Sequence, residues 1–181
     1  MDHLKRYGGK GVWAMVTGAT DGIGLEFCKQ LAEEGFNICL VSRTESKLKG
    51  VVENDLAKYG VKTRIVVADF SDGNNMDFYQ RIIDQVQDID IGLVVLNAGI
   101  SNKGYFLKAD PKVQQTTMTV NTYHVGATLL KLAEKLEKRG KRSGIIVSSS
   151  ITAQAPLPGN FVYCGTKVFA RFLVEAIAME S

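Results

Sequence analysis

The residue pair with the clearest chemical meaning lies near the end of the chain, where Tyr163 and Lys167 are four positions apart. On a helix, this spacing places both side chains on one face. A nearby ammonium favours the phenolate form of a tyrosine, so the pair predicts a tyrosine that can give and take a proton near neutral pH. So short a pattern also arises by chance, and other residues must therefore support it.

Two polar residues upstream could complete this acid–base pair. Ser150 lies 13 residues before Tyr163 and shortly after an apolar run, residues 144–147, that predicts a strand. Ligands of open parallel sheets bind at the carboxyl ends of the strands, so Ser150 is a second catalytic candidate. Asn121 lies within a long helical pattern, where a buried amide usually has a specific partner. The alternative for Asn121 is a polar plug in the helix face.

A glycine-rich segment at residues 17–24, with the sequence TGATDGIG, joins the first predicted strand to the first predicted helix. Gly18 would let the chain leave the strand sharply, Gly22 would let backbone amides approach a pyrophosphate, and Gly24 would allow close helix–sheet packing. The helix N-terminus adds free N–H groups and the positive end of its dipole. A tight turn without a ligand is the alternative, but the strand before and the helix after favour a nucleotide. The candidate cofactor-binding residues here are Gly18, Thr20, Asp21, Gly22, Ile23 and Gly24.

The end of the second predicted strand indicates which nicotinamide nucleotide is bound. NAD-binding proteins carry an acidic residue there for the ribose 2′-hydroxyl, whereas this chain has Ser42 and Arg43. A guanidinium with paired N–H donors suits a 2′-phosphate, so we predict NADP(H), with a solvated arginine as the alternative. Asp69, after the third predicted strand, could accept a hydrogen bond from the adenine amino group or cap the following turn.

The elements that position these residues follow from an alternation of short apolar runs with longer amphipathic segments. The runs are continuous in Val, Ile and Leu, which is typical of strands covered on both faces. Repeated strand–helix alternation predicts an α/β fold with a doubly wound parallel sheet of the Rossmann type, with at least five strands. Asp110 and Pro111 predict a helix start, and Gly35, Gly60 and Gly140 predict left-handed helix ends. The predicted strands are 12–16, 36–41, 64–68, 91–96 and 144–147; the predicted helices are 23–34, 45–59, 77–87, 111–139 and 161 onward.

The composition of the 181 residues is that of a globular domain and argues against several classes of function. The net charge is +3, and the densest basic stretch, residues 138–142, is typical of a solvated helix end rather than a nucleic-acid surface. Three cysteines without paired spacing indicate a reducing compartment and no zinc site. No apolar run approaches the length of a membrane span, and residues 1–10 show no signal peptide.

Taken together, these motifs resemble those of the short-chain dehydrogenase/reductase family. The resemblance covers nearly the whole chain. Segments at 13–14, 18–24, 42–44 and 90–92 look like the branch that holds 3-ketoacyl-CoA reductases and 17β-hydroxysteroid dehydrogenases. The matching features occur in the family's order and are the turn at 17–24, Asn97-Ala98-Gly99 after the fourth predicted strand, Asn121, Ser150, Tyr163 and Lys167.

The resemblance implies a role for each of these residues. Tyr163 would donate a proton to the carbonyl oxygen of a ketone whose carbon receives a hydride from NADPH. Ser150 would hydrogen-bond the same oxygen, while Lys167 would tune Tyr163 and hold the nicotinamide ribose. Asn121 would support a water that relays protons to Lys167. The adenosine and ribose side would be lined by Asn97, Ala98 and Gly99.

Two features depart from the family pattern. The family usually has an asparagine where Leu96 stands, a difference we interpret as chiefly structural. The chain also stops at Ser181, in the helix that carries Lys167, whereas the family fold continues with two further strands and a substrate-covering lid. We therefore expect one NADP-binding domain over residues 1–181 that is incomplete at its C-terminus relative to the family, and a fragment of a longer enzyme would explain this.

The resulting hypothesis is an NADPH-dependent oxidoreductase that reduces an apolar 3-ketoacyl or steroid-like ketone to a secondary alcohol, or runs the reverse reaction. Apolar side chains in the loops 100–109 and 155–160 fit such a substrate, although they could equally belong to the core. The alternative is a non-catalytic nucleotide-binding or assembly subunit, since the fifth predicted strand is a sheet edge that needs a partner or cover. The resemblance also implies a homo-oligomer, built through the two long helices. We expect a cytoplasmic location or, by the resemblance, one associated with the endoplasmic reticulum.

Overall fold

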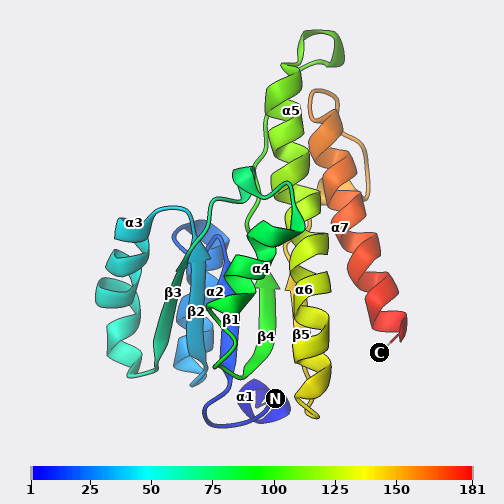
Figure 1. The fold of residues 1–181 in the computed structure, drawn as a ribbon. Coiled ribbons are helices and arrows are strands. Elements are labelled where there is room, and N and C mark those ends of the chain that lie inside the picture. Colours follow the sequence, from blue (N-terminus) through cyan, green and yellow to red (C-terminus); the bar gives the residue numbers. More distant parts are fainter. Residues whose placement is uncertain (1, 181) are drawn as a thin grey trace.

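The computed structural model describes residues 2–180 and contains a five-stranded sheet with helices on both faces (Figure 1). The strand order is β3-β2-β1-β4-β5, and every neighbouring pair is parallel. This confirms the predicted doubly wound, Rossmann-type sheet. The order of the chain reverses between β1 and β4, which places a ligand crevice beyond the carboxyl ends of these strands. The strands are β1 (Trp13–Thr17), β2 (Asn37–Ser42), β3 (Thr63–Val67), β4 (Ile91–Leu96) and β5 (Gly144–Val147).

Local capping residues mark where several helices begin and end. Asp110 accepts a hydrogen bond from the Lys112 amide, and Pro111 occupies the first helical turn behind it. Gly35, Gly60 and Gly140 all have positive φ at helix ends, as predicted. The α-helices are α1 (His3–Arg6), α2 (Gly22–Glu33), α3 (Glu45–Gly50), α4 (Met76–Asp84), α5 (Pro111–Met118), α6 (His124–Lys138) and α7 (Phe161–Glu180).

Two of the predicted helices are interrupted. The helix expected over 45–59 is α-helical only as far as Gly50 and continues as a π-helix, Val51–Leu56, and a 3-10 turn, Ala57–Tyr59. The helix expected over 111–139 contains a π-helical turn, Thr119–Tyr123, between α5 and α6. Such turns insert one extra residue per turn and occur often at functional sites. The second one contains the candidate residue Asn121.

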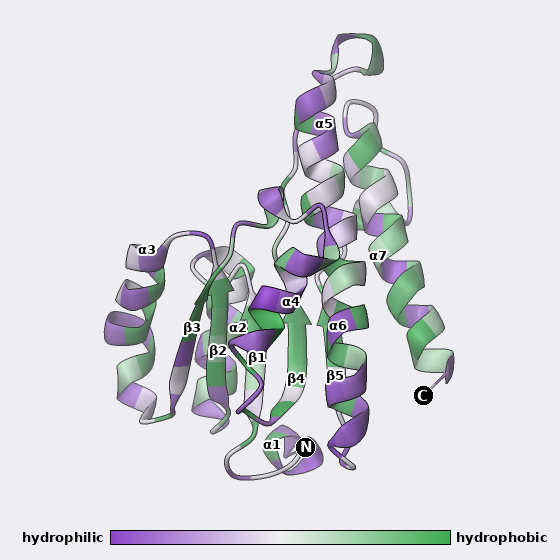
Figure 2. Ribbon diagram, viewed as in Figure 1, coloured by the Kyte–Doolittle hydropathy of each residue, from purple (hydrophilic) through white to green (hydrophobic). Residues whose placement is uncertain are grey.

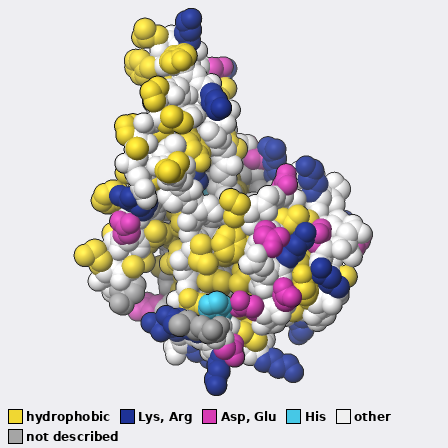
Figure 3. All heavy atoms as spheres, turned by 180° about the vertical axis from the view of Figure 1, so that it is seen from behind, with side chains coloured by type: hydrophobic (Ala, Val, Ile, Leu, Met, Phe, Trp, Pro, Cys, Tyr) yellow, Lys and Arg dark blue, Asp and Glu magenta, His cyan; other side chains and the backbone are white. Residues whose placement is uncertain are grey.

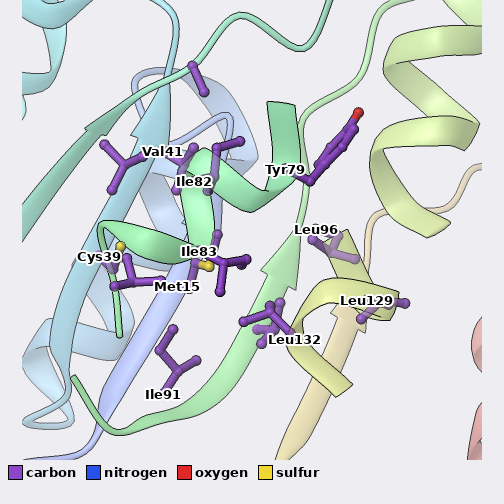
Figure 4. Close-up of a cluster of buried hydrophobic side chains, with 14 of the residues drawn as sticks. Met15, Cys39, Val41, Tyr79, Ile82, Ile83, Ile91, Leu96, Leu129 and Leu132 are labelled. Carbon is purple, nitrogen blue, oxygen red and sulfur yellow. The ribbon is translucent and has the colours of Figure 1, made fainter. Parts of the chain in front are cut away.

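The core consists of two hydrophobic layers, because alternate side chains of a strand point to opposite faces of the sheet. Met15 of β1 belongs to the layer under α4 and α6, and its neighbour Val16 belongs to the layer under α2 and α3. In the first layer, Ile82 of α4 and Leu132 of α6 pack against the sheet (Figure 4). Leu96, which stands where the family usually has asparagine, is buried in the same layer (Figure 4). In Figure 2, hydrophobic residues follow the strands, while much of α3 and α4 is hydrophilic.

The molecule extends beyond the carboxyl end of the sheet, where α5 and α7 pack side by side (Figure 1). The segment from β4 to α5 and the segment from β5 to α7 both cross this end. They are joined by a hydrogen bond of 2.8 Å from the Gly104 amide to the Gly159 carbonyl. The two loops therefore meet above the strands that end in candidate site residues. No helix within residues 2–180 is both long enough and apolar enough to cross a membrane.

Candidate active site

A cleft of about 340 Å³ opens beyond the carboxyl ends of β1, β2 and β4. Its position is the one expected for a ligand of a sheet with this strand order. Asp21 lines this cleft. The three predicted residues that follow it, Gly22, Ile23 and Gly24, form the first turn of α2 and do not line the cleft. The predicted cofactor residues that the cleft brings together are Gly18, Thr20, Asp21, Ser42, Arg43, Asp69, Asn97, Ala98 and Gly99.

The glycine turn is closely packed on one side and open on the other. A Cβ atom at Gly24 would collide with the carbonyl oxygen of Gly18, so the approach of α2 to β1 requires glycine at this position. At Gly22, with φ of +50°, an added Cβ would meet no atom within 4 Å. The Asp21 carboxylate accepts a 2.7 Å hydrogen bond from the Gly22 amide and so caps α2. The turn thus leaves room beside a helix N-terminus, which suits an anionic group.

Asn97 holds the glycine turn in place. Its side-chain amide donates to the carbonyl oxygens of Thr17 and Gly18 at 3.3 and 3.4 Å, and its Oδ1 accepts a 2.9 Å bond from the Ser148 hydroxyl. The Thr17 hydroxyl oxygen accepts from the amides of Asn97 and Ala98. Thr17 and Ser148 were not predicted as site residues. Their only sequence signals are a threonine directly before Gly18 and a run of three serines that ends at Ser150.

The end of β2 presents hydroxyl groups and a guanidinium to the cleft. The hydroxyls of Thr20 and Ser42 lie 3.1 Å apart in a hydrogen bond, and Arg43 is exposed beside them. Asp69 accepts hydrogen bonds from the amide and the hydroxyl of Ser71, at 3.0 and 2.7 Å. The capping role considered for Asp69 is therefore present, although Asp69 also lines the cleft.

Lys167 connects the cleft to the candidate acid–base residue. Its Nζ donates a 2.7 Å hydrogen bond to the carbonyl of Ser148 and lies 5.6 Å from the centroid of the Tyr163 ring. A Cβ atom placed on Gly99, in the cleft wall, would lie 3.4 Å from the same Nζ. The Lys167 side chain is buried, and this burial lowers its pKa from the ordinary value.

Asn121 fixes the chain that leaves β4. Its Oδ1 accepts a 2.9 Å bond from the amide of Ile100. Its Nδ2 donates to the carbonyl of Ile100 at 2.8 Å and to the hydroxyl of Thr166 at 3.1 Å. Both amide hydrogens therefore have partners, and the side chain is 2% exposed. Thr166 is a further residue that was not predicted, and it carries no sequence signal beyond its place next to Lys167.

Ser150 directly precedes a 3-10 turn, Ile151–Ala153, against which α7 packs. Its hydroxyl oxygen accepts hydrogen bonds from the amide and the hydroxyl of Thr152, at 3.3 and 3.0 Å. A hydroxyl has two acceptor positions and one donor. Since Thr152 fills the acceptor positions, the Ser150 O–H is left to donate to another group.

Exposed apolar side chains surround this end of the molecule. Ile151 is 80% exposed, and Leu157 and Phe161 are 49% and 39% exposed. Residues 105–107 are more exposed than either of the latter two, so the alternative that these loop side chains belong to the core is wrong. Within residues 2–180, no three His, Cys, Asp or Glu side chains are grouped in a way that could hold a metal ion.

Comparison with known proteins gives a consistent result. The profile of the family described as short chain dehydrogenase matches residues 12–181. The chain is 36% identical over 181 residues to a very-long-chain 3-oxoacyl-CoA reductase of Podospora anserina, covering 98% of this chain and 53% of that protein. The chain thus spans about half the length of the curated relatives it matches.

Solved structures agree with the fold. A 7beta-hydroxysteroid dehydrogenase superposes with a TM-score of 0.87 at 27% identity, covering 99% of this chain and 69% of that one. The L-sorbose reductase of Gluconobacter frateurii, solved with NADPH and L-sorbose, superposes with a TM-score of 0.87 at 25% identity, covering 97% and 66%.

Proposed function

This chain belongs to the short-chain dehydrogenase family, and from that premise we propose that it carries the cofactor site and the proton-transfer residues of a ketone/alcohol oxidoreductase. The observation that carries the proposal is the position of Lys167. Its ammonium lies 5.6 Å from the centroid of the Tyr163 ring and would lie 3.4 Å from a Cβ atom placed on Gly99 of the cleft wall. A nucleotide in the cleft and a carbonyl group beside Tyr163 would therefore meet at this one amine.

The residues of the cleft fit a dinucleotide. The turn at Gly22 leaves space beside the N-terminus of α2, where a pyrophosphate gains free N–H groups and the positive end of the helix dipole. We propose that the nucleotide is NADP(H), because Ser42, whose hydroxyl is bonded to that of Thr20, and Arg43 stand where an acidic residue would favour NAD. Relatives solved with NADPH, such as the L-sorbose reductase, support this choice. When bound, the nicotinamide supplies or accepts the hydride.

The protein's part in the reaction is to orient a carbonyl oxygen and to move a proton. Ser150 has an O–H left to donate, because its acceptor positions are filled by Thr152. Tyr163 would give its phenolic proton to the same oxygen and recover it in the reverse direction. The Lys167 ammonium, held by the Ser148 carbonyl, stabilises the phenolate that remains. Asn121 supports this arrangement by fixing Ile100 just after Gly99.

We propose an apolar ketone as the substrate, of the 3-ketoacyl or steroid-like class. Ile151, Leu157 and Phe161 lie between Ser150 and Tyr163 in the chain. Their exposed side chains present apolar surface at the end of the molecule that holds the candidate site. The names of the relatives, a very-long-chain 3-oxoacyl-CoA reductase and a 7beta-hydroxysteroid dehydrogenase, support both classes. These relatives are enzymes, so they lend no support to the alternative of a non-catalytic subunit.

We also propose an oligomeric state and a cellular location. A homo-oligomer built through the long helices is supported by Phe169 and Phe172 of α7, which are 44% and 56% exposed. An exposed apolar helix face of this kind favours association. The cellular location, cytoplasmic or associated with the endoplasmic reticulum, is likewise proposed only from the resemblance.

The test is a screen of ketones, including acyl-CoA thioesters and steroids, with NADPH and NADH as reductants. We expect turnover of an apolar ketone with NADPH and a loss of at least about 100-fold in Tyr163→Phe, because the phenolic proton is removed. Tyr123→Phe, at a tyrosine on the π-helical turn that the proposal does not use, is the matched control. Turnover that is equal in Tyr163→Phe and the parent chain would refute the assigned mechanism.

A further inference from the structure

Three consecutive large apolar side chains are exposed in the loop before α5. Tyr105, Phe106 and Leu107 are 73%, 75% and 92% exposed. Single apolar residues on a surface are ordinary, but a contiguous group of aromatic and aliphatic side chains marks a surface that contacts something other than water. We call residues 103–112 the apical segment.

The apical segment is held in a defined shape at the far end of the molecule. It lies at the end of the extension made by α5 and α7 (Figure 1). The Phe106 ring stands edge-on to the Phe161 ring, with centroids 5.5 Å apart, and the Gly104 amide donates to the Gly159 carbonyl. Figure 3 shows hydrophobic side chains gathered at this end, with a basic side chain at its apex.

The charges in the apical segment are predominantly positive. Lys103, Lys108 and Lys112 are all exposed, and within residues 2–180 none of the three takes part in an ion pair. The one acidic residue, Asp110, accepts a 2.8 Å bond from the Lys112 amide as the cap of α5. The segment therefore has a net charge of +2, and lysines next to exposed aromatic rings are typical of a surface that binds anionic lipid.

We propose that the apical segment docks onto an anionic lipid bilayer, with Phe106 and Leu107 inserted among the acyl chains and the lysines at the headgroups. A second copy of the chain fits this segment less well. A symmetric contact would bring the same lysines of both copies together, and a few side chains on a projecting apex offer less area than a stable protein interface buries.

The apical segment lies next to the helix that carries the candidate acid–base residue. Phe161, which packs against Phe106, begins the helix that carries Tyr163. A docked molecule therefore holds the start of α7, two residues before Tyr163, close to the bilayer, where an apolar ketone is dissolved. This last step rests on the proposed function, whereas the docking itself does not.

The first experiment measures co-sedimentation of the chain with phosphatidylcholine vesicles, with and without phosphatidylserine. We expect binding only when phosphatidylserine is present. The pair Phe106→Ser and Leu107→Ser should weaken it at least about tenfold by removing buried apolar area, and the pair Lys103→Glu and Lys108→Glu should abolish it. Two control variants on other surfaces, Leu130→Ser on α6 and Lys47→Glu on α3, should bind as the parent does.

The second experiment places a reporter in the apical segment. The chain has one tryptophan, Trp13, which is buried in the core. In Phe106→Trp, brominated lipids in the anionic vesicles should quench the new fluorescence, while the parent chain with Trp13 alone stays unquenched. Failure to bind anionic vesicles, absence of quenching, or equal loss of binding in the control variants would overturn the proposal. Neither measurement includes nucleotide or ketone, so failure of the proposed function would leave these results unchanged.

Discussion

Lys167 of α7 donates a 2.7 Å hydrogen bond from Nζ to the main-chain carbonyl of Ser148, in the segment that leaves β5. This bond fixes the end of a long flexible side chain against a segment 19 residues earlier in the chain. The same ammonium lies 5.6 Å from the centroid of the Tyr163 ring. The bond to Ser148 thus holds the ammonium near both the Tyr163 ring and Gly99, which lines the cleft.

Lys167→Met should lower turnover at least about 100-fold, because the variant removes the charge that stabilises a phenolate at Tyr163. The measurement is the rate of NADPH oxidation with the best ketone from the screen, together with the circular dichroism spectrum. Lys47→Met, at an exposed position on α3, is the control and should retain full activity. A Lys167→Met variant that is folded and fully active would contradict the assigned role.

Asn121→Leu should lower the free energy of unfolding by about 3 kcal/mol, because both the amide and the carbonyl of Ile100 lose their partner in a buried site. Denaturation by urea measures the change. Asn54→Leu is a matched control, since Asn54 is an exposed amide in the other π-helix, Val51–Leu56. It should change the stability by less than about 0.5 kcal/mol. Equal effects of the two substitutions would show that Asn121 has no special structural role.

Gly24→Ala should destabilise the chain by at least about 2 kcal/mol and weaken nucleotide binding, because the new methyl group would collide with the Gly18 carbonyl and push α2 away from β1. Thermal unfolding and nucleotide titration measure the two effects. In the control, Gly50→Ala, the nearest neighbour of an added Cβ is Asn54 Nδ2 at 3.8 Å, and the backbone is helical. It should be neutral or stabilising by up to about 1 kcal/mol. A stable Gly24→Ala variant would show that the close approach is not required.

The fold was largely predictable from the sequence, because buried parallel strands leave a continuous apolar signal. β4 and β5 begin and end at the predicted residues, and β1, β2 and β3 are each shifted by one residue. The glycines of the turn were predictable too, since only close packing or a positive φ explains such a cluster after a strand.

The π-helical turn and the hydrogen-bond partners of the site residues could not be predicted in this way. The π-helical turn at Thr119–Tyr123 shifts the helix register by one residue, which hardly disturbs an apolar pattern. The bonds of Asn97 to Thr17 and Ser148 join residues 80 and 51 positions apart in the chain. Such partners are set by the packing of the sheet rather than by any local pattern, so only the structure identifies them.

Arg43→Ala should weaken the binding of NADPH by about tenfold and leave the binding of NADH unchanged, because a charge-assisted contact to the 2′-phosphate is lost. Fluorescence titration with both nucleotides provides the two dissociation constants. Arg81→Ala on α4 removes the same charge outside the cleft and should alter neither constant. If Arg43→Ala weakened NADH as much as NADPH, the guanidinium would not distinguish the two cofactors.

A buried histidine lies close enough to Lys167 for the charge of that lysine to act on it. His124 is fully buried at the start of α6, with Nδ1 3.1 Å from the carbonyl of Val120 and its ring 4.0 Å, between centroids, from that of Phe70. Its Nε2 has no hydrogen-bond partner among the described residues. Burial lowers the pKa of His124 to about 4, and the positive charge of Lys167 adds to the effect. Protonation of this ring is therefore unfavourable in the folded state.

The free energy of unfolding should consequently fall as the pH drops from about 6.5 toward about 4, because over this range the unfolded chain binds a proton at His124 that the folded chain does not. The full effect is about 3 kcal/mol, and it levels off below about pH 4, where the folded state is protonated as well. Urea denaturation across this range should show a flatter pH dependence in His124→Phe than in the parent. Replacing the exposed His3 by glutamine leaves His124 intact and should preserve the slope. If the pH dependence of His124→Phe matched that of the parent, the acid sensitivity would have to arise from groups other than His124.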